Sequence, residues 1–174
     1  MENVIITIMC VALMIFAAMT VAQSTLSSQD TVATAWKEME RTSGEIARTN
    51  ISSLGAETSD GITISLTLEN AGETQLEDFD EWDVILQYYD ISDNYLIKRL
   101  TYNSGTPSDN EWTVEGIYLN AGSSTSEAFD PGIFNPDEEM VIEMKVNPAV
   151  GTPNANMAKV AVSNGVSATT IFTR

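Results

Sequence analysis

Residues 4–22 read VIITIMCVALMIFAAMTVA, and this stretch decides how the chain is organised. It contains no charged residue, and its only hydroxyl groups belong to Thr7 and Thr20. A helix needs roughly 20 apolar residues to cross a bilayer. A small soluble domain rarely surrounds such a run on all sides, although a core helix is the alternative. The stretch therefore predicts a hydrophobic helix that lies in a membrane or against other apolar helices.

The large apolar side chains of this helix are the expected contacts with lipid and with neighbouring copies. Each of them gains roughly 1.5–3 kcal/mol when it is fully buried. An unpaired charge among them would cost more than that. Cys10 is expected to act as a small hydrophobic residue. The predicted self-assembly surface consists of Val4, Ile5, Ile6, Ile8, Met9, Val11, Ala12, Leu13, Ile15, Phe16 and Met19.

The start of the chain lacks the basic flank of a secretory signal, because the first basic residue is Lys37. We expect that a basic leader is removed from a precursor, which makes Met1 the first mature residue; insertion without that charge cue is the alternative. Glu2 is interpreted as a charge at the helix end. Its pairing with the N-terminal amine of a neighbouring copy is the other interpretation.

The helix is expected to continue beyond the apolar stretch, to about Asn50. No proline occurs before Pro107, and apolar residues such as Leu26, Trp36 and Met39 recur at helical spacing. This second half is amphipathic, so it must pack on its own head domain or on neighbouring copies. Residues 1–54 are therefore predicted to form an N-terminal helical region, for the membrane or a filament core.

From Thr58 onward the pattern changes to alternation with a period of two. Residues 62–69, 82–90, 95–102, 112–119 and 140–146 are predicted strands, and the last hairpin turns at Asn164-Gly165. About seven strands in roughly 115 residues match an antiparallel, immunoglobulin-like β-sandwich; a small barrel is the alternative. The predicted fold class is thus a long N-terminal α-helix followed by an all-β head domain at residues 55–174.

Composition excludes several functions. The chain has 25 acidic and 8 basic residues, a net charge of −17, so its surface would repel nucleic acid. It has no histidine and one cysteine, which leaves no Cys/His metal site, no intrachain disulfide and no base for a serine or cysteine nucleophile. We therefore expect no enzymatic activity, no cofactor, no metal and no small-molecule substrate.

Two local motifs remain open. Asp78, Asp80 and Asp83 in the acidic stretch 77–83 offer hard oxygen ligands to Ca²⁺, although the spacing is not that of an EF-hand. A solvated acidic loop is the favoured interpretation, and a catalytic carboxylate pair is the least favoured. Asn50-Ile51-Ser52 is the one glycosylation sequon, so Asn50 is a candidate glycosylation site.

These parts together resemble archaeal flagellins, the archaellins, which share the plan of type IV pilins. The resemblance is one of pattern over essentially the whole chain: the uncharged start NVIITIMCVALMIFAAMTVA, the stretch ITISLTLENAGETQLEDFDEWDVILQYYD and the ending VAVSNGVSATTIF. The sequence departs from the family at its start, where Met1-Glu2-Asn3 replaces a glycine-rich beginning and no Lys/Arg-Gly cleavage site is present.

The resemblance implies a precursor that a prepilin-type peptidase cuts, membrane insertion before assembly, and then a helical filament outside the cell. The partners it implies are copies of the same chain together with assembly and motor machinery. The implied function is a structural subunit of an archaellum, used for motility. Two alternatives share the same plan: an adhesive pilin, and a membrane-anchored β-sandwich binding module such as a stator component of the archaellum.

Overall fold

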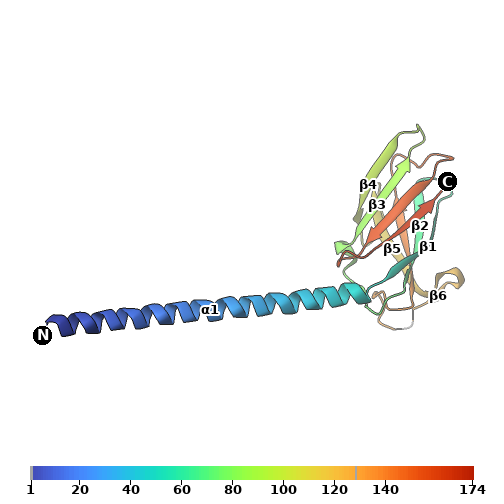
Figure 1. Cartoon of the computed structure of the whole chain (residues 1–174). Coiled ribbons are helices and arrows are strands. Elements are labelled where there is room, and N and C mark those ends of the chain that lie inside the picture. The colour runs from blue at the N-terminus through green and yellow to red at the C-terminus, as the bar shows by residue number, and fades with distance from the viewer. Residues whose placement is uncertain (1, 128) are drawn as a thin grey trace. The chain divides into compact units, whose positions relative to one another are not determined.

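The computed structural model describes residues 2–127 and 129–174, which form two units, Met1–Ser43 and Gly44–Arg174. The first unit lies within helix α1 (Glu2–Arg48), which is long and apolar enough to cross a membrane (Figure 1). Hydroxyl groups in its apolar part donate to carbonyl oxygens one turn earlier, Thr7 to Asn3 at 2.8 Å and Thr20 to Phe16 at 2.6 Å. These bonds leave no free hydroxyl donor on the apolar stretch.

The second unit holds the last turn of α1 and all the strands. The strands are β1 (Ile51–Glu57), β2 (Thr63–Asn70), β3 (Asp83–Tyr89), β4 (Tyr95–Tyr102), β5 (Glu111–Asn120), β6 (Thr125–Ser126), β7 (Glu139–Lys145), β8 (Asn156–Ala161) and β9 (Ser167–Phe172). Short 3₁₀ turns, η1 (Phe79–Glu81) and η2 (Ala121–Ser123), connect some of them. The predicted fold class, a long helix followed by an all-β head, is confirmed.

The strands form one sheet in the order β1-β2-β7-β5-β4-β3-β8-β9, and β6 pairs with β5. Strands β1 and β9 are spatial neighbours, so the sheet nearly closes on itself as a barrel-like sandwich. Every pairing is antiparallel except that of β4 with β5, which is parallel over two residue pairs. This short parallel pairing joins the two halves of the sandwich, β1-β2-β7-β5 and β4-β3-β8-β9.

The residues that the structure describes form nine strands, where the sequence predicts about seven. Strand β1 lacks clean alternation because its register shifts between Ser53 and Gly55, and Gly55 has a φ of 152°. Strand β6 has two residues and carries no periodic signal. The predicted hairpin turn at Asn164-Gly165 joins β8 and β9, with Gly165 at a φ of 88°.

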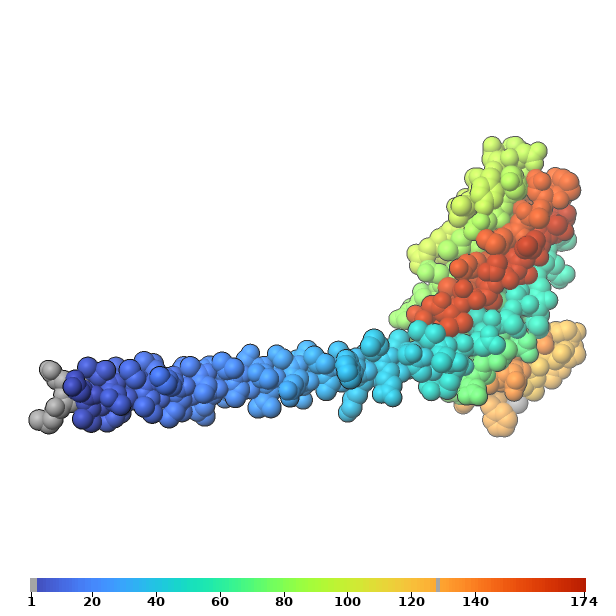
Figure 2. Space-filling view, viewed as in Figure 1, coloured from blue at the N-terminus to red at the C-terminus, as the bar shows by residue number. Residues whose placement is uncertain are grey.

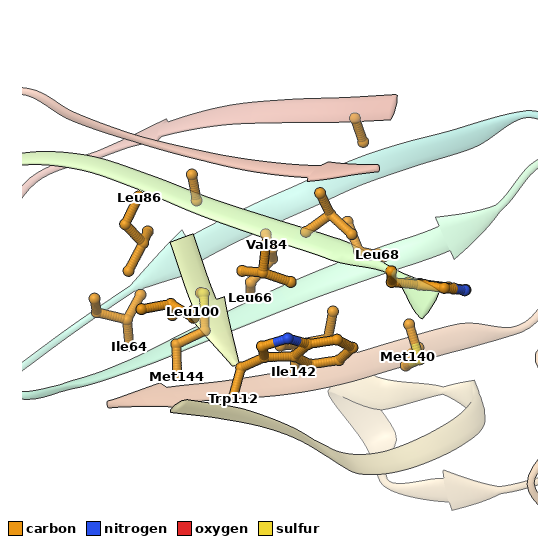
Figure 3. Close-up of a cluster of buried hydrophobic side chains, with 14 of the residues drawn as sticks. Ile64, Leu66, Leu68, Val84, Leu86, Leu100, Trp112, Met140, Ile142 and Met144 are labelled. Atoms are coloured by element: carbon orange, nitrogen blue, oxygen red, sulfur yellow. The ribbon is translucent and has the colours of Figure 1, made fainter. Parts of the chain in front are cut away.

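The core lies between the two halves of the sandwich. One half contributes Ile64, Leu66 and Leu68 from β2 and the alternate residues of β7, and the other contributes Val84 and Leu86 from β3 (Figure 3). The side chain of Trp112 is completely buried among them. Because every second residue of these strands is buried, the remaining positions form two outward faces.

Candidate functional site

The apolar half of α1 is the most unusual surface of the chain. Its side chains are uncovered all around the helix, and none of its most apolar window is buried (Figure 2). Phe16 is 69% exposed and Leu13 is 65% exposed. All eleven residues of the predicted self-assembly surface are exposed. Water solvates such a surface poorly, so this part of the helix is compatible with insertion into a membrane.

The second half of the helix is polar with an apolar stripe. Val32, Trp36 and Met39 are exposed and recur at intervals of three to four residues. Glu38 accepts a bond of 2.6 Å from Arg41 one turn later, and this partner lowers the pKa of the Glu38 carboxyl. This half of the helix therefore carries an apolar stripe together with the Glu38–Arg41 ion pair.

The end of α1 is fastened to the head by contacts that sequence analysis missed. The backbone N–H of Glu73 donates to the Arg48 carbonyl at 2.8 Å, which satisfies one of the free carbonyls at the helix end. The side-chain amide of Asn164 donates to the Thr49 hydroxyl at 2.7 Å, and Thr49 is buried. These residues are 115 positions apart, so no local pattern reports the contact.

Gly72 permits this close approach. A Cβ atom at Gly72 would lie 2.5 Å from the backbone nitrogen of Asn50 and 2.6 Å from the Arg48 carbonyl oxygen. Both distances are too short for any side chain, and the atoms involved belong to the backbone. The turn after β2 and the end of the helix can therefore pack together only with glycine at this position.

The two local motifs lie on the surface of the head. The Asn50 side chain is exposed between α1 and β1, as an attachment site requires, and glycosylation stays a prediction. Asp78 precedes η1 with a φ of 53°, whereas Asp83 accepts a bond of 2.6 Å from Arg99 on β4. Among the residues that the structure describes, no group of three or more His, Cys, Asp or Glu side chains is placed to hold a metal ion.

Other carboxylates with altered pKa values have structural roles. Asp90 accepts bonds from the side chain and backbone of Asn94 and from the backbone of Ser92, and these bonds lower its pKa. The pKa of Asp60 is lowered by the backbone N–H groups of Thr63 and Ile62. These carboxylates close turns between strands, and their geometry gives no sign of acid–base catalysis.

A groove of about 670 Å³ lies on the outward face of β1, β2, β7 and β5. Glu57, Glu115 and Glu139 are among its lining residues, together with Tyr118 and Val141. The groove is thus an acidic hollow with some apolar surface. It lies within the head unit and was not predicted, because alternation identifies strands but not which strands become neighbours.

Comparison with solved structures finds proteins whose fold is similar to that of this chain. A chain of the archaeal flagellum of Methanospirillum hungatei strain JF1 is similar over 96% of this chain and 90% of that chain, with a TM-score of 0.61 and 11% identity. The fold is archaellin-like. The resemblance inferred from the sequence is therefore confirmed at the level of the fold.

Stator proteins have a similar fold. The archaellum periplasmic stator protein FlaG from Sulfolobus acidocaldarius matches 71% of this chain and 99% of its own length, with a TM-score of 0.53 and 18% identity. A chain of the complex of FlaF and FlaG from the same organism matches 70% of this chain and 87% of its own, with the same TM-score and identity. No protein-family model and no curated protein matches the sequence.

Proposed function

We propose that this chain is a structural subunit of an archaellum, which polymerises through its N-terminal hydrophobic helix into a filament outside the cell. Before assembly the same helix holds the subunit in the membrane. The filament serves motility, with assembly and motor machinery as its further partners. The chain has no enzymatic role in this function, and it acts through contacts with copies of itself.

The observation that carries this proposal is the uncovered apolar half of α1. A monomer in water would expose eleven apolar contact residues on one helix, whereas a bundle of such helices buries them. The fold likeness to the archaeal flagellum chain supports the bundle, because it extends over 96% of this chain and so takes in the helix as well as the head.

A stator component is the second candidate. It is favoured by the higher identity to the stator chains, 18% against 11%. In that function a single helix would anchor the head in the membrane, and the head would bind a component of the cell envelope. The stator likenesses span about 70% of this chain, against 96% for the chain of the archaeal flagellum.

The test is shearing of intact cells that produce the chain, followed by electron microscopy and mass spectrometry of the released material. A filament subunit is the main protein of sheared polymers, whereas a stator component stays with the envelope. Swimming assays on cells that lack the chain separate an archaellum from an adhesive pilus. Sheared filaments without this chain would contradict the proposal.

A further inference from the structure

The outward face of β3, β4, β8 and β9 carries an apolar row. The strand register places Ile97, Gln87, Met157 and Ile171 side by side across the four strands, so three of the four side chains in the row are apolar and Gln87 is polar. Ile97 is 63% exposed and Ile171 is 71% exposed. Neighbouring strands are about 4.8 Å apart, so the row is roughly 14 Å long. Because these apolar side chains are grouped in one row and not scattered, the row is a candidate contact surface.

The adjacent row on the same face is basic. It contains Arg99, Ile85, Lys159 and Thr169 in register. Among the outward positions of these four described strands the one acid is Asp83, and it pairs with Arg99. We call this surface the apolar-basic face. Two bases on one face are notable in a chain that has 25 acids and 8 bases overall.

The outward face of β1, β2, β7 and β5 has the opposite character, and we call it the acidic face. Among its outward positions Lys145 is the one base. The groove described above hollows this face. Its outward acids are Glu57, Glu69, Glu111, Glu115, Glu139 and Glu143.

We propose that the apolar-basic face of one head docks on the acidic face of a second copy, a contact that rests on the filament function proposed above. Arg99 and Lys159 meet the glutamates of the partner, and the apolar row covers the groove. Charge complementarity selects the second copy as the occupant, because each face would repel its own kind. The uncharged side chains of the row, Ile97 and Ile171, are removed from water.

This contact is heterologous, because it joins two different faces. The hydrophobic core lies between the two strand groups, so the faces point away from each other. Such a contact leaves one free face at each end and therefore repeats into an open polymer. It also explains how heads of strongly negative chains stand close together: the few bases are placed where neighbours meet.

The test uses two charge-reversed variants of the full chain. Arg99→Glu with Lys159→Glu makes both faces acidic, and Glu57→Lys with Glu143→Lys places two lysines among the acids of the acidic face, where they repel Arg99 and Lys159 of a neighbour. Each variant alone is expected to lose filaments, whereas a mixture of the two forms filaments again, since every contact in an alternating polymer is then complementary. A chain with all four substitutions also assembles. Near-UV circular dichroism checks that each head is folded.

The matched control is Glu77→Lys with Glu81→Lys, which makes the same charge change in the segment between β2 and β3, outside the strands that form the two faces. This variant is expected to assemble as the unchanged chain does. If the apolar-basic face docked on the same face of a second copy, the variant with Glu57→Lys and Glu143→Lys would assemble normally. That result would overturn the proposal. Folded variants whose mixture forms no filaments overturn it as well.

A second measurement separates this inference from the proposed function. The two variants, solubilised in detergent as full chains, are expected to associate at least tenfold more tightly with each other than with themselves in sedimentation at low ionic strength. If the unchanged chain forms no filaments but the variants associate, the filament function fails and the contact stands. If the unchanged chain forms filaments but the variants do not associate, the filament function stands and the docking contact is overturned.

Discussion

The helix and the head use apolar residues in opposite ways. In the head, residues such as Leu66 and Leu86 are at most 1% exposed, and the chain itself supplies their neighbours. In α1, Leu13 and Phe16 are more than 60% exposed, and the chain supplies none. The head thus supplies its own hydrophobic core, whereas the helix leaves its apolar side chains exposed, and we propose that other copies cover them. A leucine in the head therefore contributes to folding stability, whereas we expect a leucine in the helix to contribute to association.

The largest effect is expected from an acid in the apolar half of the helix. Phe16→Asp or Ala12→Asp places a charge where the proposed bundle excludes water, which costs more than any one apolar contact returns. Filaments should be absent from both variants by electron microscopy, while the head keeps its fold by near-UV circular dichroism. Thr34→Asp, in the second half of the same helix and away from the stripe of Val32 and Trp36, is the control and should assemble. Normal filaments from Phe16→Asp would contradict the proposal that the apolar half of the helix is buried between copies.

A pair of leucine substitutions sharpens the comparison. Leu66→Ala leaves a cavity in the head and should lower its free energy of unfolding by about 2–5 kcal/mol. Leu13→Ala removes the same atoms from the helix, where they have no neighbours in the single chain, so head stability should stay unchanged. The reverse is expected for filament melting, which Leu13→Ala should lower directly. Head stability is measured by urea unfolding of detergent-solubilised chains, and filament stability by filament melting. If the two variants changed both quantities alike, the proposed difference between the head and the helix would be refuted.

Much of this organisation can be predicted from the sequence, because the decisive signals are local. The helix follows from a long stretch without proline, and β2 and β7 follow from strict alternation. Strand β1 was missed because the bulge at Gly55 interrupts its alternation. In β5 the register shift between Val114 and Gly116 likewise alters the pattern, but a longer strand leaves enough of it to be recognised.

The remaining features depend on contacts between distant residues. The bond between Asn164 and Thr49 and the close approach at Gly72 require the folded topology. The two outward faces depend on strand order: alternation identifies Lys159 and Ile97 as outward residues, but not that β3 lies between their strands. The assembly role of the helix, the glycan at Asn50 and the domain division at residues 54 and 55 stay predictions. The structure itself ends α1 at Arg48 and begins β1 at Ile51.

The junction gives a test of intermediate size. Gly72→Ala should destabilise the head by about 1–3 kcal/mol, the usual cost of overpacking, because the new methyl group meets backbone atoms of Arg48 and Asn50. Gly105→Ala is the matched control, since the nearest atom to its added Cβ is 3.5 Å away. Thermal unfolding of both variants measures the difference. Equal stability would show that the end of the helix is not held as closely as the structure has it.

The smallest expected effects are those of pH. They should change the stability of the head and not the contacts made by the apolar half of α1. Burial, with the charge of Asp90 as a second cause, raises the pKa of Tyr88 to about 12, and the Tyr88 hydroxyl donates to the Pro148 carbonyl at 3.0 Å. Because the folded pKa lies above the unfolded value of about 10, this group stabilises the head fully below pH 10 and loses its contribution as the pH rises to about 12. Tyr88→Phe should cost about 0.5–1.5 kcal/mol at neutral pH, the net value of one hydrogen bond, and should remove this part of the alkaline loss.

At acidic pH the dependence has the opposite sign, because the head loses stability as the pH falls. The pKa of Asp90 is lowered by the hydrogen bonds from Asn94 and Ser92, so Asp90 stabilises the head above its ordinary pKa of about 4 and loses that contribution as the pH falls through its folded value. Asp90→Asn should therefore lower stability at neutral pH and flatten the decline in acid. Glu81→Gln, on the exposed turn η1, is the control and should leave the profile unchanged. Urea unfolding from pH 2 to 12, followed by near-UV circular dichroism, gives both limbs.

The apolar half of α1 has no titratable acid or base other than Cys10 between residues 4 and 22. A filament whose melting followed the same two limbs as the isolated head would thus show that polymer stability is limited by folding of the head and not by contacts of the helix.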